Sequence, residues 1–251
     1  SLTSYESYDR YQPKESDANP GLFVDFLFAS DISAFSQEIR LASNNDSGFN
    51  WIAGVVYAKD DVEESPPRIG YLDDYIGLRA RLVYDQGRDS SSVYAQGEWE
   101  LSEALKLTAG VRYIEESLDF TKEIAFLLPP NFGIENRLVL ATVPDLNLGV
   151  DGKLDSEEIT WRLQLDYQMS DQILLYASAS TGFKGGGFNG GLATNPRLSI
   201  PFLPEEVFAL EAGFKSMLID RTLRLNGAVF VYDYEGLQAA TPKVDEVLGT
   251  P

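Results

Sequence analysis

The sequence contains neither cysteine nor histidine among its 251 residues. Without cysteine the chain forms no disulfide, no thiolate zinc site and no cysteine nucleophile. Without histidine it lacks the commonest general base and the commonest transition-metal ligand, and a Ser-His-Asp triad is excluded. We therefore expect no enzymatic activity, no metal site and no cofactor.

Basic residues are also scarce, because 20 Lys and Arg stand against 39 Asp and Glu, for a net charge of −19. This balance repels phosphate backbones, so we expect no nucleic-acid partner. No run of about 18 apolar residues occurs, which excludes a transmembrane helix. It does not exclude a membrane β-barrel, because a barrel spreads its lipid-facing residues over alternate positions of many strands.

Aromatic residues are abundant at 12% of the chain, and they favour strands over helices. The clearest strand pattern lies in residues 92–101, where Val93, Trp99 and Leu101 fall on one face and Gln96 and Glu98 on the other. Residues 105–113 alternate in the same way after a very short connection. Such a connection between two alternating segments predicts an antiparallel hairpin.

The same hairpin pattern recurs along the chain. The paired segments are residues 35–43 with 49–59, 92–101 with 105–113, 158–167 with 172–181, and 207–215 with 222–234, and residues 2–8 are a candidate first strand. Long polar connections separate the hairpins, at about residues 60–90, 121–157 and 184–205. Successive connections of an antiparallel meander lie at opposite ends of the sheet, so all the short turns share one end. This asymmetry, with strands of about 9–11 residues, is typical of outer-membrane barrels.

The two faces of these strands differ in polarity. One face carries more charge than a packed interior accommodates, namely Glu38, Arg40, Glu98, Glu100, Arg112, Arg162, Asp166, Glu211, Lys215 and Arg224. We predict that this face meets water in a wide lumen, whereas the apolar face meets lipid. A girdle of aromatic residues is predicted at the membrane interface, near the strand ends, from Tyr57, Tyr113, Tyr167, Tyr232 and Tyr234.

Six stretches resemble the barrel domain of TonB-dependent outer-membrane receptors of environmental proteobacteria. They are FSQEIRLAS, WIAGVVY, YAQGEWELSEALKLTAGVRY, LLYASASTGFKGGGFN, ALEAGFKS and LNGAVFVYDYEGLQ, in the family's order across most of the chain. The resemblance implies an all-β, antiparallel up-and-down meander of about 8–9 strands that forms part of a roughly 22-stranded transmembrane β-barrel. It also implies that residues 1–251 are a partial barrel domain, with the plug domain and the C-terminal strands outside it.

The function implied by the resemblance is import of a scarce nutrient across the cell outer membrane. The expected cargo is a ferric siderophore or another small nutrient chelate, and haem is disfavoured because its receptors typically use a barrel histidine. The expected partners are outer-membrane lipid and the TonB complex, which would supply energy through the missing N-terminal region. Two alternatives stay open, a small stand-alone porin-like or adhesion barrel without energised transport and an outer-membrane hydrolase that uses loop carboxylates.

The candidate ligand-binding residues combine lumen arginines with loop side chains: Arg112, Arg162, Tyr71, Phe132, Phe188 and Asn189. The arginines could pair with an anionic chelate, and the aromatic rings could stack on a ring of the ligand. The competing interpretations are ion pairing with lumen carboxylates for the arginines and loop packing for the aromatic rings. The acidic loops argue mildly against a strongly anionic cargo.

Overall fold

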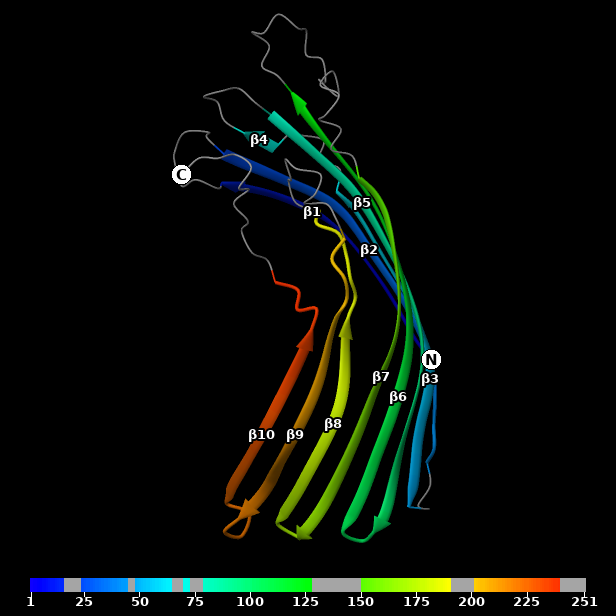
Figure 1. Cartoon of the computed structure of the whole chain (residues 1–251), viewed down its shortest axis with the longest axis vertical. Coiled ribbons are helices and arrows are strands. Elements are labelled where there is room, and N and C mark those ends of the chain that lie inside the picture. Colours follow the sequence, from blue (N-terminus) through cyan, green and yellow to red (C-terminus); the bar gives the residue numbers. More distant parts are fainter. Residues whose placement is uncertain are drawn as a thin grey trace, which may run out of the picture.

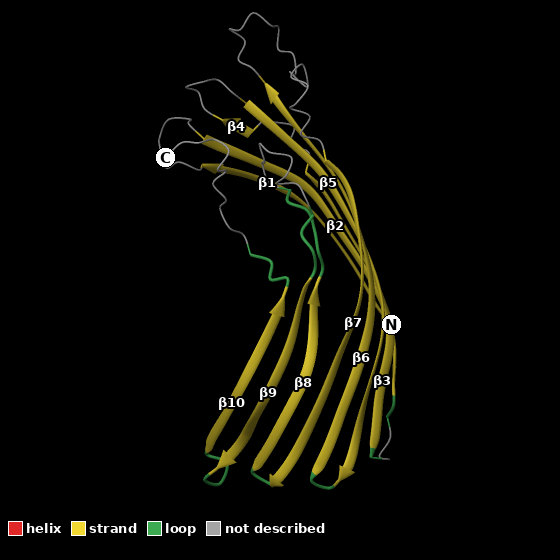
Figure 2. Ribbon diagram, in the orientation of Figure 1, coloured by secondary structure: helices red, strands yellow, loops and turns green. Residues whose placement is uncertain are grey.

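A computed structural model describes residues 1–15, 24–44, 48–64, 70–72, 79–127, 150–190 and 201–239. The strands are β1 (Leu2–Glu15), β2 (Val24–Ala42), β3 (Phe49–Glu64), β4 (Gly70–Leu72), β5 (Arg79–Ser102), β6 (Leu105–Leu127), β7 (Val150–Ser170), β8 (Ile173–Lys184), β9 (Glu205–Leu218) and β10 (Leu223–Glu235). Strands, turns and loops make up these ranges (Figure 2). Within them no helix is long and apolar enough to cross a membrane.

All the strands belong to one antiparallel sheet, in the order β1-β2-β3-β5-β6-β7-β8-β9-β10, and the short β4 pairs with β2 and β5. Apart from β4, each strand pairs with the next one along the chain, which confirms the predicted all-β up-and-down meander. Figure 1 shows one curved layer whose short turns gather at the lower end. The sheet therefore has a concave face, a convex face and a single turn end.

The strands are longer than the sequence predicted. β5, β6 and β7 have 24, 23 and 21 residues, so parts of the expected loops at 60–90 and 121–157 are strand. The β6–β7 ladder continues as far as the pair Lys122 and Val150, nine positions past Tyr113 and Ile159, the last apolar pair on the outward face. A ladder requires only backbone hydrogen bonds between neighbours. Hydropathy therefore locates the lipid-crossing part of a strand but not the end of its pairing.

The convex face carries a sharply bounded apolar belt. On β6 and β7 the outward pairs are Val111 with Trp161, then Tyr113 with Ile159, and then Glu115 with Glu157. The Tyr113 hydroxyl lies 2.8 Å from Glu115 Oε1 and 3.1 Å from Glu157 Oε2. The Tyr113 ring thus lies at the edge of the apolar belt, and its hydroxyl contacts the first polar residues beyond it, as expected of a residue in an interface girdle.

The girdle prediction is wrong for Tyr232 and Tyr234. In the β9–β10 register these residues lie opposite Ala209 and Val207, on the concave face that also carries Glu211. The lipid-facing positions of β10 are instead the alternate ones, such as Val229 and Val231. Residues 228–232 are apolar or aromatic on both faces, so hydropathy could not decide which face of β10 points outward.

A small hydrophobic cluster lies on the concave face, beyond the apolar belt. Leu118 and Phe120 of β6 are 1% exposed, and Phe188, which follows β8, is 9% exposed. The Phe120 and Phe188 rings stack with centroids 4.9 Å apart and planes 2° apart, and Tyr84 and Leu154 pack against the cluster. This contact fixes the segment after β8 against the inner wall of the sheet.

Candidate functional site

Two of the predicted ligand residues lie close together on the concave face. Arg112 on β6 pairs with Thr160, and Arg162 on β7 pairs with Gly110, so the two arginines are diagonal neighbours. Diagonal positions of an antiparallel pair are about 7–8 Å apart. Gly110 has no side chain, and the Gln96 side chain lies over it, 3.4 Å from where a Cβ would be.

These arginines line a hollow of about 670 Å³ in the concave wall, which we call the arginine hollow. Its polar lining comes from β2, β5, β6, β7 and β8, namely Glu38, Tyr94, Gln96, Arg112, Thr160, Arg162, Ser180 and Thr181. Small-molecule sites usually measure about 300–1,000 Å³. The arginine hollow is therefore large enough for a small nutrient chelate.

Tyr94 and Glu38 close one side of the hollow by a contact that spans three strands. The Tyr94 hydroxyl donates a hydrogen bond to Glu38 Oε1 at 2.5 Å, across the intervening strand β3. The ring crosses Gly54, where an added Cβ would lie 2.7 Å from the Tyr94 oxygen. Sequence reasoning placed Glu38 on the wet face but did not predict its contact with Tyr94, because only the strand register shows that a glycine separates them.

Neutral groups hold both arginines. An Nη of Arg112 donates to Ser92 Oγ at 2.9 Å, and an Nη of Arg162 donates to the side-chain oxygen of Gln164. Within the described ranges the ion pairs with carboxylates involve other cations, such as Arg10 with Glu64 at 2.8 Å and Lys106 with Glu98 at 3.7 Å. The predicted alternative, ion pairing of Arg112 and Arg162 with lumen carboxylates, is thus absent from this part of the chain.

Phe188 and Asn189 lie outside the arginine hollow. The Phe188 ring is stacked on Phe120, and the Asn189 carbonyl accepts a hydrogen bond from Lys122 Nζ at 3.1 Å. Lys122 is 3% exposed, and this burial lowers the pKa of its ammonium group. The ligand roles of Phe188 and Asn189 stay predictions, and the burial of the Phe188 ring favours loop packing.

The other two predicted residues cannot be joined to the site. Tyr71 belongs to β4, where the structure describes the backbone only, and Phe132 lies outside the described residues. The described ranges also hold no group of three or more acidic side chains that could bind a metal ion. The site is therefore a polar hollow in a lumen wall that carries two arginines.

A junction of three chain segments lies next to the hydrophobic cluster. The Gln238 side-chain amide donates to Gly185 O and to Leu203 O, both at 3.0 Å, and the Gln238 backbone N–H donates to Glu205 Oε2 at 2.8 Å. Gly187 and Phe202 form a two-way backbone bridge beside it. At Gly186 an added Cβ would lie 2.6 Å from the Phe202 carbonyl oxygen. The glycine-rich stretch thus permits a close approach of two backbones.

Replacing Gln238 with alanine removes two side-chain hydrogen bonds from this junction. Each is worth about 0.5–1.5 kcal/mol. We expect backbone amides near Gly187 and Phe202 to exchange with deuterium roughly ten-fold faster in the full-length protein, with the apolar belt unaffected. Gln238→Glu should behave like the alanine variant, because a carboxylate cannot donate to two carbonyls. Gln172→Ala, in an exposed turn, is the matched control, and equal exchange in all three variants would contradict this role.

The comparisons with known proteins agree with this architecture. Residues 1–250 match the family described as TonB dependent receptor-like, beta-barrel. The fold is similar to the ferric yersiniabactin uptake receptor FyuA from Yersinia pestis, with a TM-score of 0.66 and 16% identity over 94% of this chain and 33% of that one. It is also similar to the siderophore receptor PiuA from Acinetobacter baumannii, with a TM-score of 0.58 and 17% identity over 91% and 36% of the two chains.

A third similar structure is the copper transporter OprC, with a TM-score of 0.58 and 13% identity over 92% of this chain and 34% of that one. The chain therefore spans about a third of the length of these structures. At such identities the similarity establishes the fold alone. The match along nearly the whole sequence establishes more: this chain belongs to the TonB-dependent receptor-like β-barrel family, whose members are outer-membrane proteins.

Proposed function

We propose that this chain forms part of the lumen wall of a receptor that imports a ferric siderophore, with energy coupled through the TonB complex. The observation that carries the proposal is the pair Arg112 and Arg162, which share one hollow and have no carboxylate ion pair within the described ranges. A guanidinium group binds carboxylate-type oxygens in a fork of two parallel hydrogen bonds. An anionic ferric chelate would supply such oxygens.

The size of the hollow supports the same proposal. About 670 Å³ accommodates a small chelate, and the walls offer neutral hydrogen-bonding groups such as Gln96, Thr160 and Ser180 beside the two cations. FyuA is a ferric yersiniabactin uptake receptor, and PiuA is a siderophore receptor. OprC is described as a copper transporter, so the fold alone leaves the cargo open. The choice of a ferric chelate rests on the charge of the wall.

Arg112→Ala in the full-length receptor is expected to weaken the binding of a ferric chelate by about ten-fold or more. A hydrogen bond to a charged group is worth about 1.5–3 kcal/mol, and 1.4 kcal/mol corresponds to a factor of ten. Arg112→Lys should recover part of the loss, because lysine keeps the charge but not the fork. Fluorescence quenching with ferric catecholate, ferric hydroxamate and ferric citrate measures the affinities.

Lys153→Ala is the control for the charge change, because Lys153 lies on the convex face beyond the belt and pairs with Asp155 at 3.6 Å. It should bind every chelate as the unmodified receptor does.

Cells without TonB should bind the chelate but not import it, which separates capture from energy coupling. Failure of all three chelates to bind at micromolar concentration, or unchanged binding by the Arg112→Ala, Arg162→Ala double variant, would refute the proposed cargo.

A further inference from the structure

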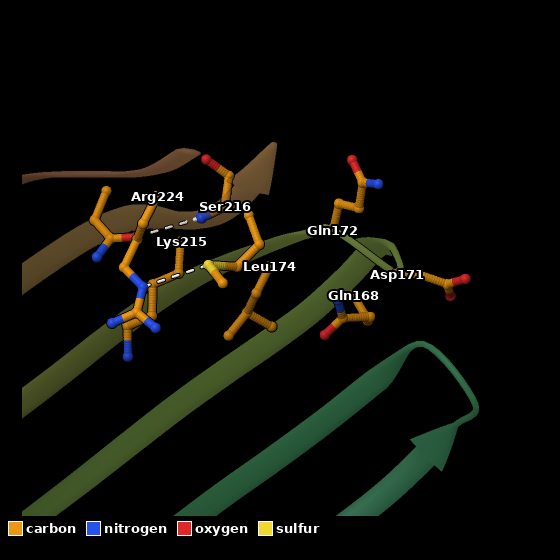
Figure 3. A pocket seen from close by; sticks show the side chains of 9 residues that line it. Gln168, Asp171, Gln172, Leu174, Lys215, Ser216 and Arg224 are labelled. Carbon is orange, nitrogen blue, oxygen red and sulfur yellow. Dashed lines mark hydrogen bonds between the residues drawn. The ribbon is translucent and has the colours of Figure 1, made fainter. Parts of the chain in front are cut away.

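A second hollow lies at the turn end of the sheet and shares no lining residue with the arginine hollow. Its volume is about 280 Å³, and it is formed by the β7–β8 turn together with β9 and β10. We call it the turn-end hollow, and Figure 3 shows its side chains. In outer-membrane barrels the short turns face the periplasm. The turn-end hollow is below the usual size of a small-molecule site but ample for one bound side chain.

Two cations line this hollow from neighbouring strands. Lys215 on β9 lies opposite Asn226 on β10, and Arg224 is two residues from Asn226 on the same face. Figure 3 shows the Lys215 and Arg224 side chains extending in the same direction. Like charges at neighbouring positions of a sheet repel each other, and neither cation has a carboxylate ion pair in the part of the chain that the structure describes.

Neutral contacts hold both head groups in place. Arg224 Nε donates to the Met217 sulfur at 3.4 Å, and a thioether is a weak acceptor. Lys215 Nζ lies 5.5 Å from the centre of the Tyr176 ring, and that ring is itself anchored by a 2.6 Å hydrogen bond from its hydroxyl to Glu211 Oε1. These contacts orient the two positive charges without neutralising them.

The remaining lining is suited to a peptide. The Gln168 side-chain amide donates hydrogen bonds to the backbone carbonyls of Ser170 and Ile173, at 2.6 and 3.3 Å. These bonds to the turn fix the orientation of the amide, and its oxygen can accept a hydrogen bond from a ligand. Among the described residues, Asp171 supplies the one carboxylate that lines this hollow, and in Figure 3 it points away from Lys215 and Arg224. An incoming anion would therefore meet cations and amides rather than a carboxylate at the head groups.

We propose that the turn-end hollow binds an acidic peptide segment, with one carboxylate held between Arg224 and Lys215. The Arg224 guanidinium provides the fork that matches a carboxylate, and Lys215 adds a second charge-assisted hydrogen bond. The amides of Gln168 and Asn226 pair with the peptide backbone beside that carboxylate. This site goes beyond nutrient import, because it uses neither the arginine hollow nor the cargo.

The test uses the full-length receptor in detergent and a fluorescein-labelled hexaglutamate peptide, followed by fluorescence anisotropy at low ionic strength, where salt screens charges least. Saturable binding is expected, with the affinity reduced at least ten-fold in Lys215→Gln, Arg224→Gln and partly recovered in Lys215→Gln, Arg224→Lys. The double variant Lys153→Gln, Arg221→Gln changes the net charge equally at exposed positions and should bind like the unmodified receptor. Inorganic phosphate should compete poorly, because it offers no backbone groups to the amides.

Absence of saturable hexaglutamate binding would overturn the proposal. So would an equal loss in Lys153→Gln, Arg221→Gln, because the attraction would then reflect net charge only. If inorganic phosphate displaced the labelled peptide at the same concentration as unlabelled hexaglutamate does, the hollow would be a general anion site, and the peptide assignment would be refuted. Ferric-chelate binding by the same variants should stay unchanged. The peptide proposal and the import proposal can therefore be refuted independently of each other.

Discussion

Replacing Leu163 with arginine is expected to lower the free energy of unfolding of the barrel in lipid by about 2–4 kcal/mol, the cost of a basic side chain at the bilayer midplane. Leu163 lies midway between Ile159 and Tyr167 in the apolar belt of β7 and is 47% exposed. Its register partners Ala109 and Ala179 share the convex face. The exposed side chain therefore meets hydrocarbon in the membrane.

The matched control is the next residue along the strand. Gln164 points to the concave face, where its amide donates to both carboxylate oxygens of Asp166 at 2.9 and 3.0 Å. Gln164→Arg removes the exposed hydrogen bond from Arg162 but gains an ion pair with Asp166, and it should change the stability by less than about 1 kcal/mol. Urea titration of the full-length protein in phospholipid vesicles measures both. Equal losses in the two variants would show that the convex face of β7 does not face lipid.

Phe120→Ala is expected to lower the free energy of unfolding by about 3 kcal/mol or more, the usual effect of truncating a buried phenylalanine. Phe120 is 1% exposed, and its ring contacts both Phe188 and Tyr84, with centroid distances of 4.9 and 5.8 Å. The substitution would leave a cavity and would also remove the ring on which Phe188 stacks. Hydrogen exchange of the segment around Phe188 should therefore accelerate together with the loss of stability.

Two further variants are controls for Phe120→Ala. Phe120→Leu keeps most of the volume and should lose about 1 kcal/mol. Leu203→Ala removes a side chain that is 71% exposed, and its effect should stay within about 0.5 kcal/mol. A loss as small for Phe120→Ala as for Leu203→Ala would mean that the cluster of Leu118, Phe120 and Phe188 does not hold the segment after β8 to the wall.

The contrast between β6 and β10 shows how far alternation predicts a sheet. On β6 the polar and apolar positions are cleanly separated, so the outward face from Leu107 to Tyr113 followed directly from the sequence and is confirmed by the pairing with β7. On β10 apolar residues occupy both faces, and Tyr232 and Tyr234 were assigned to the wrong one. A periodic pattern carries information only where one of the two faces is polar.

The candidate site divides in the same way. Arg112 and Arg162 could be found from the sequence because each occupies a polar position of a regularly alternating strand, on the face predicted to meet water. The contact between Tyr94 and Glu38 could not, because 56 residues of chain separate them and only the register of β2, β3 and β5 brings the hydroxyl to the carboxylate. Gln238 was missed because its partners, Gly185 and Leu203, lie at opposite ends of the β8–β9 connection, far from Gln238 along the chain.

The sequence by itself determined that this chain is a meander of antiparallel strands with one lipid-facing and one wet face and with its short turns at one end, because period-2 hydropathy and turn length are local properties. The tertiary structure decided which residues from different strands and connections lie next to each other. It extended the strands past the apolar belt, buried Phe188 on Phe120, gathered the arginine hollow from six strands and placed Lys215 beside Arg224 at the turn end. These arrangements depend on cross-strand register, which contacts far apart in the chain fix collectively.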